Sequence, residues 1–120
     1  SVNAVINYAG GYLVEVIESS SVEDCARDPR TTTYGLTKVD YDTYTLQMSE
    51  NHTATFRASG STISASGSHT FAEDEGMTTE SYNISVNYKG EVSGGSGWSW
   101  KSDNSSLECT GSSTFTGLKN

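Results

Sequence analysis

Basic residues and long apolar runs are both scarce in this chain. Seven Lys and Arg stand against fifteen Asp and Glu, which gives a formal net charge of −8. A chain this acidic lacks the positive charge that attracts a phosphate backbone or an anionic lipid surface, so we expect neither nucleic acid nor a membrane as a partner. No apolar run approaches the roughly 18 residues of a membrane-spanning helix. The composition therefore predicts a soluble protein.

Proline and large apolar side chains are also few. The 120 residues include a single Pro and a hydrophobic fraction of 33%, against 20 Ser and 15 Thr. This length is that of one ordinary domain, and the low apolar content leaves only a thin core for it. We therefore expect residues 1–120 to form one domain.

Sequence signatures of the common enzymes are missing. There is no Gly-x-Ser-x-Gly, His-Glu-x-x-His, Gly-x-Gly-x-x-Gly or Walker loop, and no Asp-x-Asp-x-Asn-Gly loop for calcium. Of the two histidines, His52 is predicted in an exposed turn, whereas strand parity places His69 on an apolar face beside Phe71. We predict no metal and no cofactor, and we favour a non-enzymatic function.

Cysteine occurs only twice, as Cys25 and Cys109. Their separation is far from any local metal or redox spacing, so we predict a structural disulfide. Closing a loop of about 85 residues contributes roughly 4 to 5 kcal/mol in the chain-entropy model. Because such a bond persists in oxidising surroundings, the pair predicts a secreted, extracellular or periplasmic protein.

Three Asn-x-Ser/Thr sequons are present, at Asn51, Asn83 and Asn104. The Ser and Thr content makes about two sequons expected by chance, so their number alone predicts nothing. Their positions are more informative, because Asn51 and Asn104 fall in predicted turns and Asn83 on the polar face of a predicted strand. We treat them as candidate N-glycosylation sites, although a bacterial exported protein would acquire the same pattern by drift.

Helical periodicity is missing, and apolar residues recur at every second position, which is typical of β-strands. The chain is therefore predicted to be all-β, with strands at 4–8, 12–17, 44–48, 54–58, 62–71, 81–89, 92–100 and 107–118. The Gly10-Gly11 pair predicts a bend or bulge between the first two. A polar connection from Ser19 to Thr33 follows, with one short helical turn predicted around Val22 to Arg27.

The alternation also predicts which face of each strand is buried. Five apolar side chains should point inward: Phe56, Ile63, Phe71, Ile84 and Val86. Five neighbouring residues should point outward: Thr55, Arg57, Ser64, Asn83 and Ser85. A strand with the two sets reversed would reveal a misplaced bulge.

About seven or eight antiparallel strands joined by short turns predict a closed meander barrel, with a two-sheet β-sandwich as the alternative. The inward positions favour the barrel, because they mix small residues with large rings, as a tapered interior requires. These are Ala65, Gly67, Gly94 and Ser96 on one side and Phe71, Trp98 and Trp100 on the other. The shape is similar to that of lipocalin barrels. The Gly-x-Trp near the start of that family is absent, since Gly11-Tyr12-Leu13 stands there, and no family is assigned.

Aromatic residues make up 10% of the chain and provide the best functional lead. Their flat faces stack on sugar rings or apolar ligands, while Tyr hydroxyls and Trp N–H groups need polar partners. We predict a pocket for a small apolar or saccharide ligand, lined by Met48, His69, Tyr82, Tyr88, Trp98 and Trp100. Gly67, Gly94 and Ser96 on neighbouring inward positions predict open space beside the rings.

Two other functions stay open at this point. The chain could be a structural subunit of an extracellular fibre or coat, self-assembling as its apolar N-terminal segment and Ser/Thr-rich strands pair with a neighbour's sheet edge. An enzyme using His69 with a nearby carboxylate is the third reading.

Overall fold

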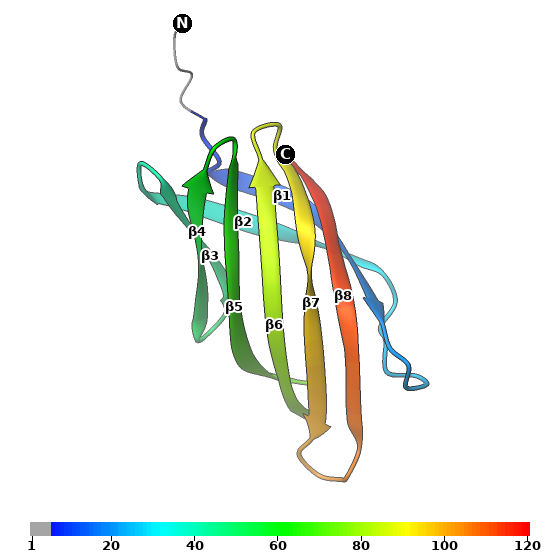
Figure 1. The fold of residues 1–120 in the computed structure, drawn as a ribbon. Helices are drawn as coiled ribbons and strands as arrows, with labels where there is room; N and C mark the ends of the chain where they lie inside the picture. Colours follow the sequence, from blue (N-terminus) through cyan, green and yellow to red (C-terminus); the bar gives the residue numbers. More distant parts are fainter. Residues whose placement is uncertain (1–5) are drawn as a thin grey trace, which may run out of the picture.

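The computed structural model describes residues 6–120 and contains eight strands within them (Figure 1). Their bounds are β1 (Gly10–Ser19), β2 (Arg30–Asp40), β3 (Thr43–Ser49), β4 (His52–Ser59), β5 (Thr62–Glu73), β6 (Gly76–Asn87), β7 (Glu91–Ser102) and β8 (Glu108–Lys119). Each strand pairs antiparallel with the next, and β8 pairs with β1, which closes the barrel. The predicted meander barrel is confirmed, and the sandwich alternative is wrong.

The chain enters the barrel differently from the prediction of two strands around a bulge. Residues 4 and 5 of the first predicted strand lie outside the described residues, and residues 6–9 form no strand. β1 begins at Gly10, whose φ of 131° favours glycine. Tyr8 is buried instead, with its ring edge-on to Tyr44 at 5.5 Å and its carbonyl accepting from the Tyr12 hydroxyl at 2.7 Å. Residues 6–9 therefore pack over one end of the barrel.

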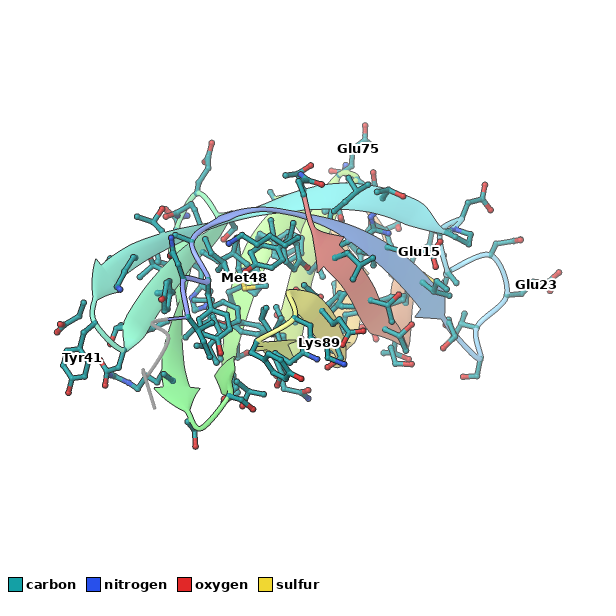
Figure 2. All side chains as sticks on the ribbon, turned by 90° about the horizontal axis from the view of Figure 1, so that it is seen from above. Glu15, Glu23, Tyr41, Met48, Glu75 and Lys89 are labelled. Atoms are coloured by element: carbon teal, nitrogen blue, oxygen red, sulfur yellow. A yellow bond between two sulfur atoms is a disulfide. The ribbon has the colours of Figure 1, made fainter. Side chains whose placement is uncertain are left out.

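Inward and outward positions follow the predicted alternation. Phe56, Ile63, Ile84 and Val86 are buried in the core, and Phe71 is half-buried. Thr55, Arg57, Ser64 and Asn83 are exposed, and Ser85 is half-buried. No strand has the two sets reversed, because the register stays continuous along the paired stretches of β5, β6 and β7. Figure 2, which looks down on the molecule, shows the Met48 side chain within the ring of strands and Tyr41 outside it.

The turn after β5 has the geometry of a tight hairpin. Asp74 and Glu75 both have positive φ, at 51° and 58°. Such a pair matches the twist of the two flanking strands and continues the ladder without a bulge, as the pairing of Glu73 with Gly76 shows. This acidic turn is therefore the tip of a long, regular hairpin formed by β5 and β6.

The barrel wall is not paired along its whole height. β4 pairs with β5 only from Arg57 to Ser59, and β2 pairs with β3 only from Thr37 to Asp40. The β3–β4 hairpin is short and ends partway along β5 (Figure 1). Beyond its tip the wall separates, and this separation forms the opening described below.

The connection between β1 and β2 covers residues 20–29 and is tied to the last strand. Cys25 forms a disulfide with Cys109 of β8, with their Cα atoms 5.5 Å apart, so the predicted pairing is confirmed. A turn closed by the Cys25 N–H donating to the Val22 carbonyl at 3.3 Å replaces the predicted helical turn. Asp24 has a φ of 62° inside this turn, which ends any helical progression there.

The three sequons lie where the sequence places them. Asn51 and Asn104 are exposed in connections, and Asn83 is exposed on the outer face of β6. Within residues 6–120, no helix of a length and apolarity that could span a bilayer is found.

Candidate ligand-binding site

The barrel is hollow at the end where the β1–β2 connection crosses it. A cavity of about 290 Å³, here called the inner cavity, lies beneath this connection. Its lining residues are Glu18, Asp24, Cys25, Ala26, Arg27, Arg30, Phe71, Glu73, Asp74, Thr78, Glu80, Trp98, Trp100, Cys109 and Ser113. The disulfide and the connection thus form part of its wall.

A second hollow of about 490 Å³, here called the side opening, lies where β2 and β5 separate beyond the β3–β4 hairpin. It is lined by Val16, Arg30, Thr32, Thr33, Tyr34, Gly35, Leu46, Gln47, Met48, His69, Phe71, Glu73, Glu80 and Phe115. Arg30, Phe71, Glu73 and Glu80 line both hollows. The side opening therefore adjoins the inner cavity.

The indole rings of Trp98 and Trp100 each pack against a glycine of the barrel wall. Trp98 of β7 pairs with Gly111 of β8, and a methyl group on Gly111 would collide with the Trp98 ring. A methyl group on Gly76 would likewise collide with the Trp100 ring. The Trp100 Nε1–H donates to the Glu73 carbonyl at 2.8 Å, which fixes that ring. The Trp98 Nε1–H is buried and has no partner within residues 6–120.

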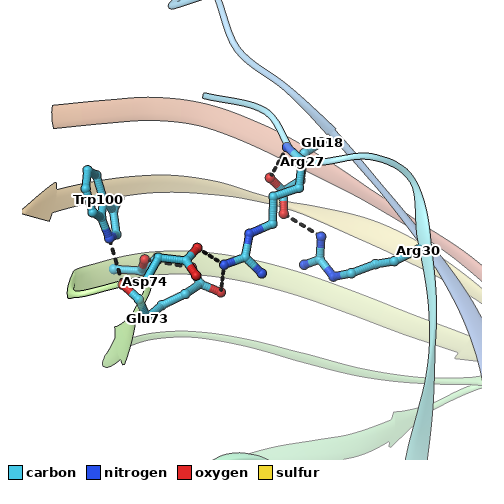
Figure 3. A network of polar contacts seen from close by, with 7 residues as sticks. Glu18, Arg27, Arg30, Glu73, Asp74 and Trp100 are labelled. Atoms are coloured by element: carbon cyan, nitrogen blue, oxygen red, sulfur yellow. Dashed lines mark hydrogen bonds and ion pairs between the residues drawn. The ribbon is translucent and has the colours of Figure 1, made fainter. Parts of the chain in front are cut away.

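Ion pairs close the rim of the inner cavity (Figure 3). The Arg27 guanidinium binds the carboxylates of Asp74 and Glu73, the latter at 3.3 Å. Glu18 accepts from the Arg27 backbone N–H at 3.1 Å and from the Arg30 guanidinium at 2.6 Å. Burial opposes the charge of Arg27, but the hydrogen bond to Asp74 and the neighbouring carboxylates raise its pKa above the ordinary value.

Both histidines face the interior, and His52 corrects the prediction of an exposed turn residue. His52 is the first residue of β4, half-buried, and its Nε2 lies 2.7 Å from the Tyr82 hydroxyl. Its ring centroid is 4.8 Å from that of His69. The turn ends one residue earlier than predicted, so His52 takes the inward parity of Ala54 and Phe56.

His69 is buried, as its strand parity predicts, and both of its ring nitrogens are satisfied. Nδ1 lies 3.2 Å from the Ser49 hydroxyl, and Nε2 lies 3.0 Å from Oε1 of Glu80. A neutral imidazole with its proton on Nε2 makes both hydrogen bonds. The site therefore contains a Ser–His–carboxylate arrangement beside the side opening.

Four of the six ligand-binding residues predicted from the sequence line one of the two hollows. Trp98 and Trp100 line the inner cavity, and Met48 and His69 line the side opening. Tyr82 is buried beneath the histidines and lines neither hollow. Tyr88 is 57% exposed in the turn after β6, away from both. Tyr88 takes no part in the site described here.

The small inward residues do not create the space that the sequence predicts from them. A methyl group on Gly67 would meet the Tyr82 hydroxyl, and one on Gly94 would meet the backbone of Asn83. These glycines allow close contact with a ring and with the backbone. The hollow volume comes instead from the separation of the strands beyond the β3–β4 hairpin.

Sequence reasoning overlooked the charged residues that face inward. Glu80 shares the parity of Tyr82 and Ile84, and Glu18 shares that of Val14 and Val16, so alternation alone would have placed both inside. Burial, followed by the charge of Glu80, raises the pKa of Tyr34 to about 12. Aromatic rings, carboxylates and an unpartnered N–H donor thus meet in one hollow.

Comparison of the chain with protein-family models, with curated proteins and with solved structures gives no match. The chemistry of the two hollows is what indicates a function. Rings can enclose an apolar body, and the buried polar groups can fix its orientation.

Proposed function

We propose that this is a secreted, non-enzymatic β-barrel that binds a small apolar or saccharide ligand in the inner cavity. The observation that carries the proposal is the hollow lined by Trp98, Trp100 and Phe71 and adjoined by the side opening. Ligand sites are typically hollows of about 300 to 1,000 Å³ with aromatic walls and few polar groups. The inner cavity, at about 290 Å³, lies just below that range, and the side opening, at about 490 Å³, lies within it.

The unpartnered Trp98 N–H supports a bound molecule rather than a filled core. A buried donor without an acceptor costs about 1 to 3 kcal/mol, so a ligand oxygen that accepts from it recovers that energy. Trp98 lies beside Glu80 and Trp100 in the hollow. An apolar body with one or two acceptors, or a sugar ring, fits this combination.

The Cys25–Cys109 disulfide supports the exported location of the proposal. Such bonds persist in oxidising compartments and are rare in the cytosol. The three sequon Asn residues are exposed, and none of them lines either hollow.

The test is a screen of lipids and glycans monitored by tryptophan fluorescence. Both tryptophans line the inner cavity, so a bound ligand should shift or quench the emission. Trp98→Ala should weaken binding at least about tenfold and leave a folded barrel, whereas the control Tyr88→Ala should change neither. A loss of roughly 3 to 5 kcal/mol of stability in Trp98→Ala, with no ligand signal from the screen, would identify the rings as core and end the proposal.

A second candidate function is ester or amide hydrolysis, and the Ser49–His69–Glu80 arrangement favours it. His69 Nδ1 would take the Ser49 proton as the hydroxyl oxygen attacks the carbonyl carbon, and Glu80 would hold the imidazolium. Return of that proton to the leaving group and hydrolysis of the acyl-serine would complete the turnover. Nitrophenyl ester hydrolysis that disappears in Ser49→Ala would support this function, and equal rates would reject it.

The fibre or coat hypothesis makes a different prediction. Unpaired backbone along β2 and β5 is confined to the stretch where the wall separates, so strand addition between molecules would have to occur there. Size-exclusion chromatography and electron microscopy distinguish the two. A monodisperse monomer opposes a fibre, and filaments oppose the binding proposal.

A further inference from the structure

The charge of the two hollows indicates which ligands they select, an inference that rests on the proposed binding function. Their walls carry five carboxylates (Glu18, Asp24, Glu73, Asp74 and Glu80) against two guanidiniums (Arg27 and Arg30), an excess of three negative charges. We propose that the ligand is an organic cation whose ammonium group binds Glu80 and whose apolar body lies against Trp98.

The two arginines are already occupied by carboxylates of the wall. Arg30 binds Glu18 at 2.6 Å, and the Glu18 side chain is only 10% exposed. Arg27 binds Glu73 and Asp74 together. An anionic ligand would have to displace these carboxylates, so the arginines do not make the hollow an anion site.

Glu80 lies where the inner cavity and the side opening meet, since it lines both. Its side chain is 16% exposed, and only Oε1 is bound, by the 95% buried imidazole of His69. Within residues 6–120, no hydrogen bond to its second oxygen is found. A cation that reaches this second oxygen gains both a hydrogen bond and a charge partner.

The ring that would hold the ligand body is the direct neighbour of this carboxylate. Glu80 of β6 pairs with His69 of β5 on one side and with Trp98 of β7 on the other. Side chains opposite each other on one face of a sheet have Cβ atoms about 5 Å apart. A ligand whose ammonium group binds the carboxylate can therefore reach the neighbouring Trp98 side chain with its apolar body.

The test uses three probes that share one benzene ring and differ in charge: 2-phenylethylamine, 2-phenylethanol and phenylacetate. Isothermal titration calorimetry at neutral pH should give the amine an affinity at least about tenfold above that of the alcohol, because a charge-assisted hydrogen bond adds about that much. Phenylacetate should bind weakest. The charged carboxylate is partly buried, so the preference should persist at moderate salt.

Glu80→Gln keeps an acceptor for His69 and removes the charge. In this variant the affinity for the amine should fall to that for the alcohol, while the affinity for the alcohol is retained. The matched control Glu15→Gln removes a carboxylate of the exposed outer face of β1 and should keep the preference.

Three results would overturn the inference. Equal binding of amine and alcohol by the unaltered protein would mean a real pocket without charge selection, and tighter binding of phenylacetate would mean that the arginines are free. If none of the three probes binds, the inference is also wrong, and the proposed function is then judged separately by the lipid and glycan screen.

Discussion

Individual glycines determine where the two indole rings lie. Gly76 and Gly111 have no side chain, so the rings of Trp100 and Trp98 can lie directly against them. Not every glycine of the barrel wall has such a contact, since Gly97 of β7 has nothing within 4 Å of an added methyl group. The position of each indole ring therefore depends on the glycine that it packs against.

Gly111→Ala should lower the free energy of unfolding by roughly 1 to 3 kcal/mol, because the new methyl group meets both Trp98 and the Ser19 carbonyl. It should also shift the tryptophan emission by moving the ring. Urea denaturation measures the first effect and fluorescence the second. Gly97→Ala is the control, and similar losses in both variants would contradict this account.

Buried tyrosines make the stability sensitive to alkaline pH. The pKa of Tyr12 is raised to about 12, mainly by burial and to a smaller extent by the neighbouring Tyr44 and Tyr8. The pKa of Tyr34 is also raised to about 12, mainly by burial and then by the charge of Glu80. Because the unfolded chain ionises near pH 10, stability should be fully present below that pH and should fall progressively up to about pH 12. Tyrosinate absorbance and urea denaturation across this range measure the effect. A flat stability profile would contradict it.

At the scale of elements, two connections shape the site. The short β3–β4 hairpin leaves β2 and β5 apart, and the β1–β2 connection covers the barrel end. The disulfide and the ion pairs of Arg27 hold this connection at two points, on β8 and at the β5–β6 turn. The cavity therefore depends on covalent and ionic links between elements distant in sequence.

Replacing Cys25 and Cys109 by Ser should cost roughly 2 to 5 kcal/mol, because the unfolded chain regains the entropy of a loop spanning 84 positions. The same change releases the connection from β8 and should weaken binding of any ligand that the cavity holds. Urea denaturation of the variant, and of the unaltered protein after reduction of its disulfide, measures the loss of stability. Unchanged stability would show that the ion pairs alone hold the connection.

At the scale of the molecule, the barrel has a filled end and a hollow end. Tyr8, Tyr12 and Tyr44 close the first, with the Tyr8 N–H 3.4 Å from the Tyr44 hydroxyl. Trp98 and Trp100 line the second. The ion pairs of Arg27 and Arg30 form its rim (Figure 3). The filled end supplies a core for folding, and the hollow end is therefore available for a ligand.

The sequence by itself determined the all-β class, the buried faces of the strands that it located, and the disulfide. It did not locate β2, because residues 30–33 were assigned to the polar connection from Ser19 to Thr33 and residues 34–40 to no strand. Alternation along a strand is a local signal, and it predicted that Ile63 and Ile84 point inward. The presence of only two cysteines was enough to predict one disulfide. The same alternation held the information for Glu80 and Glu18, because both share the inward parity of their strands.

Only the tertiary structure decided where the barrel is hollow. The end of each ladder depends on how far two neighbouring strands run together, as for Arg57 with Ser64 or Thr37 with Thr45. It also decided that His52, Ser49 and Glu80 gather around His69, although they come from β4, β3 and β6. The two-residue alternation of side chains determines which face of a strand is buried. The length over which two strands pair is set by tertiary contacts that no local pattern contains.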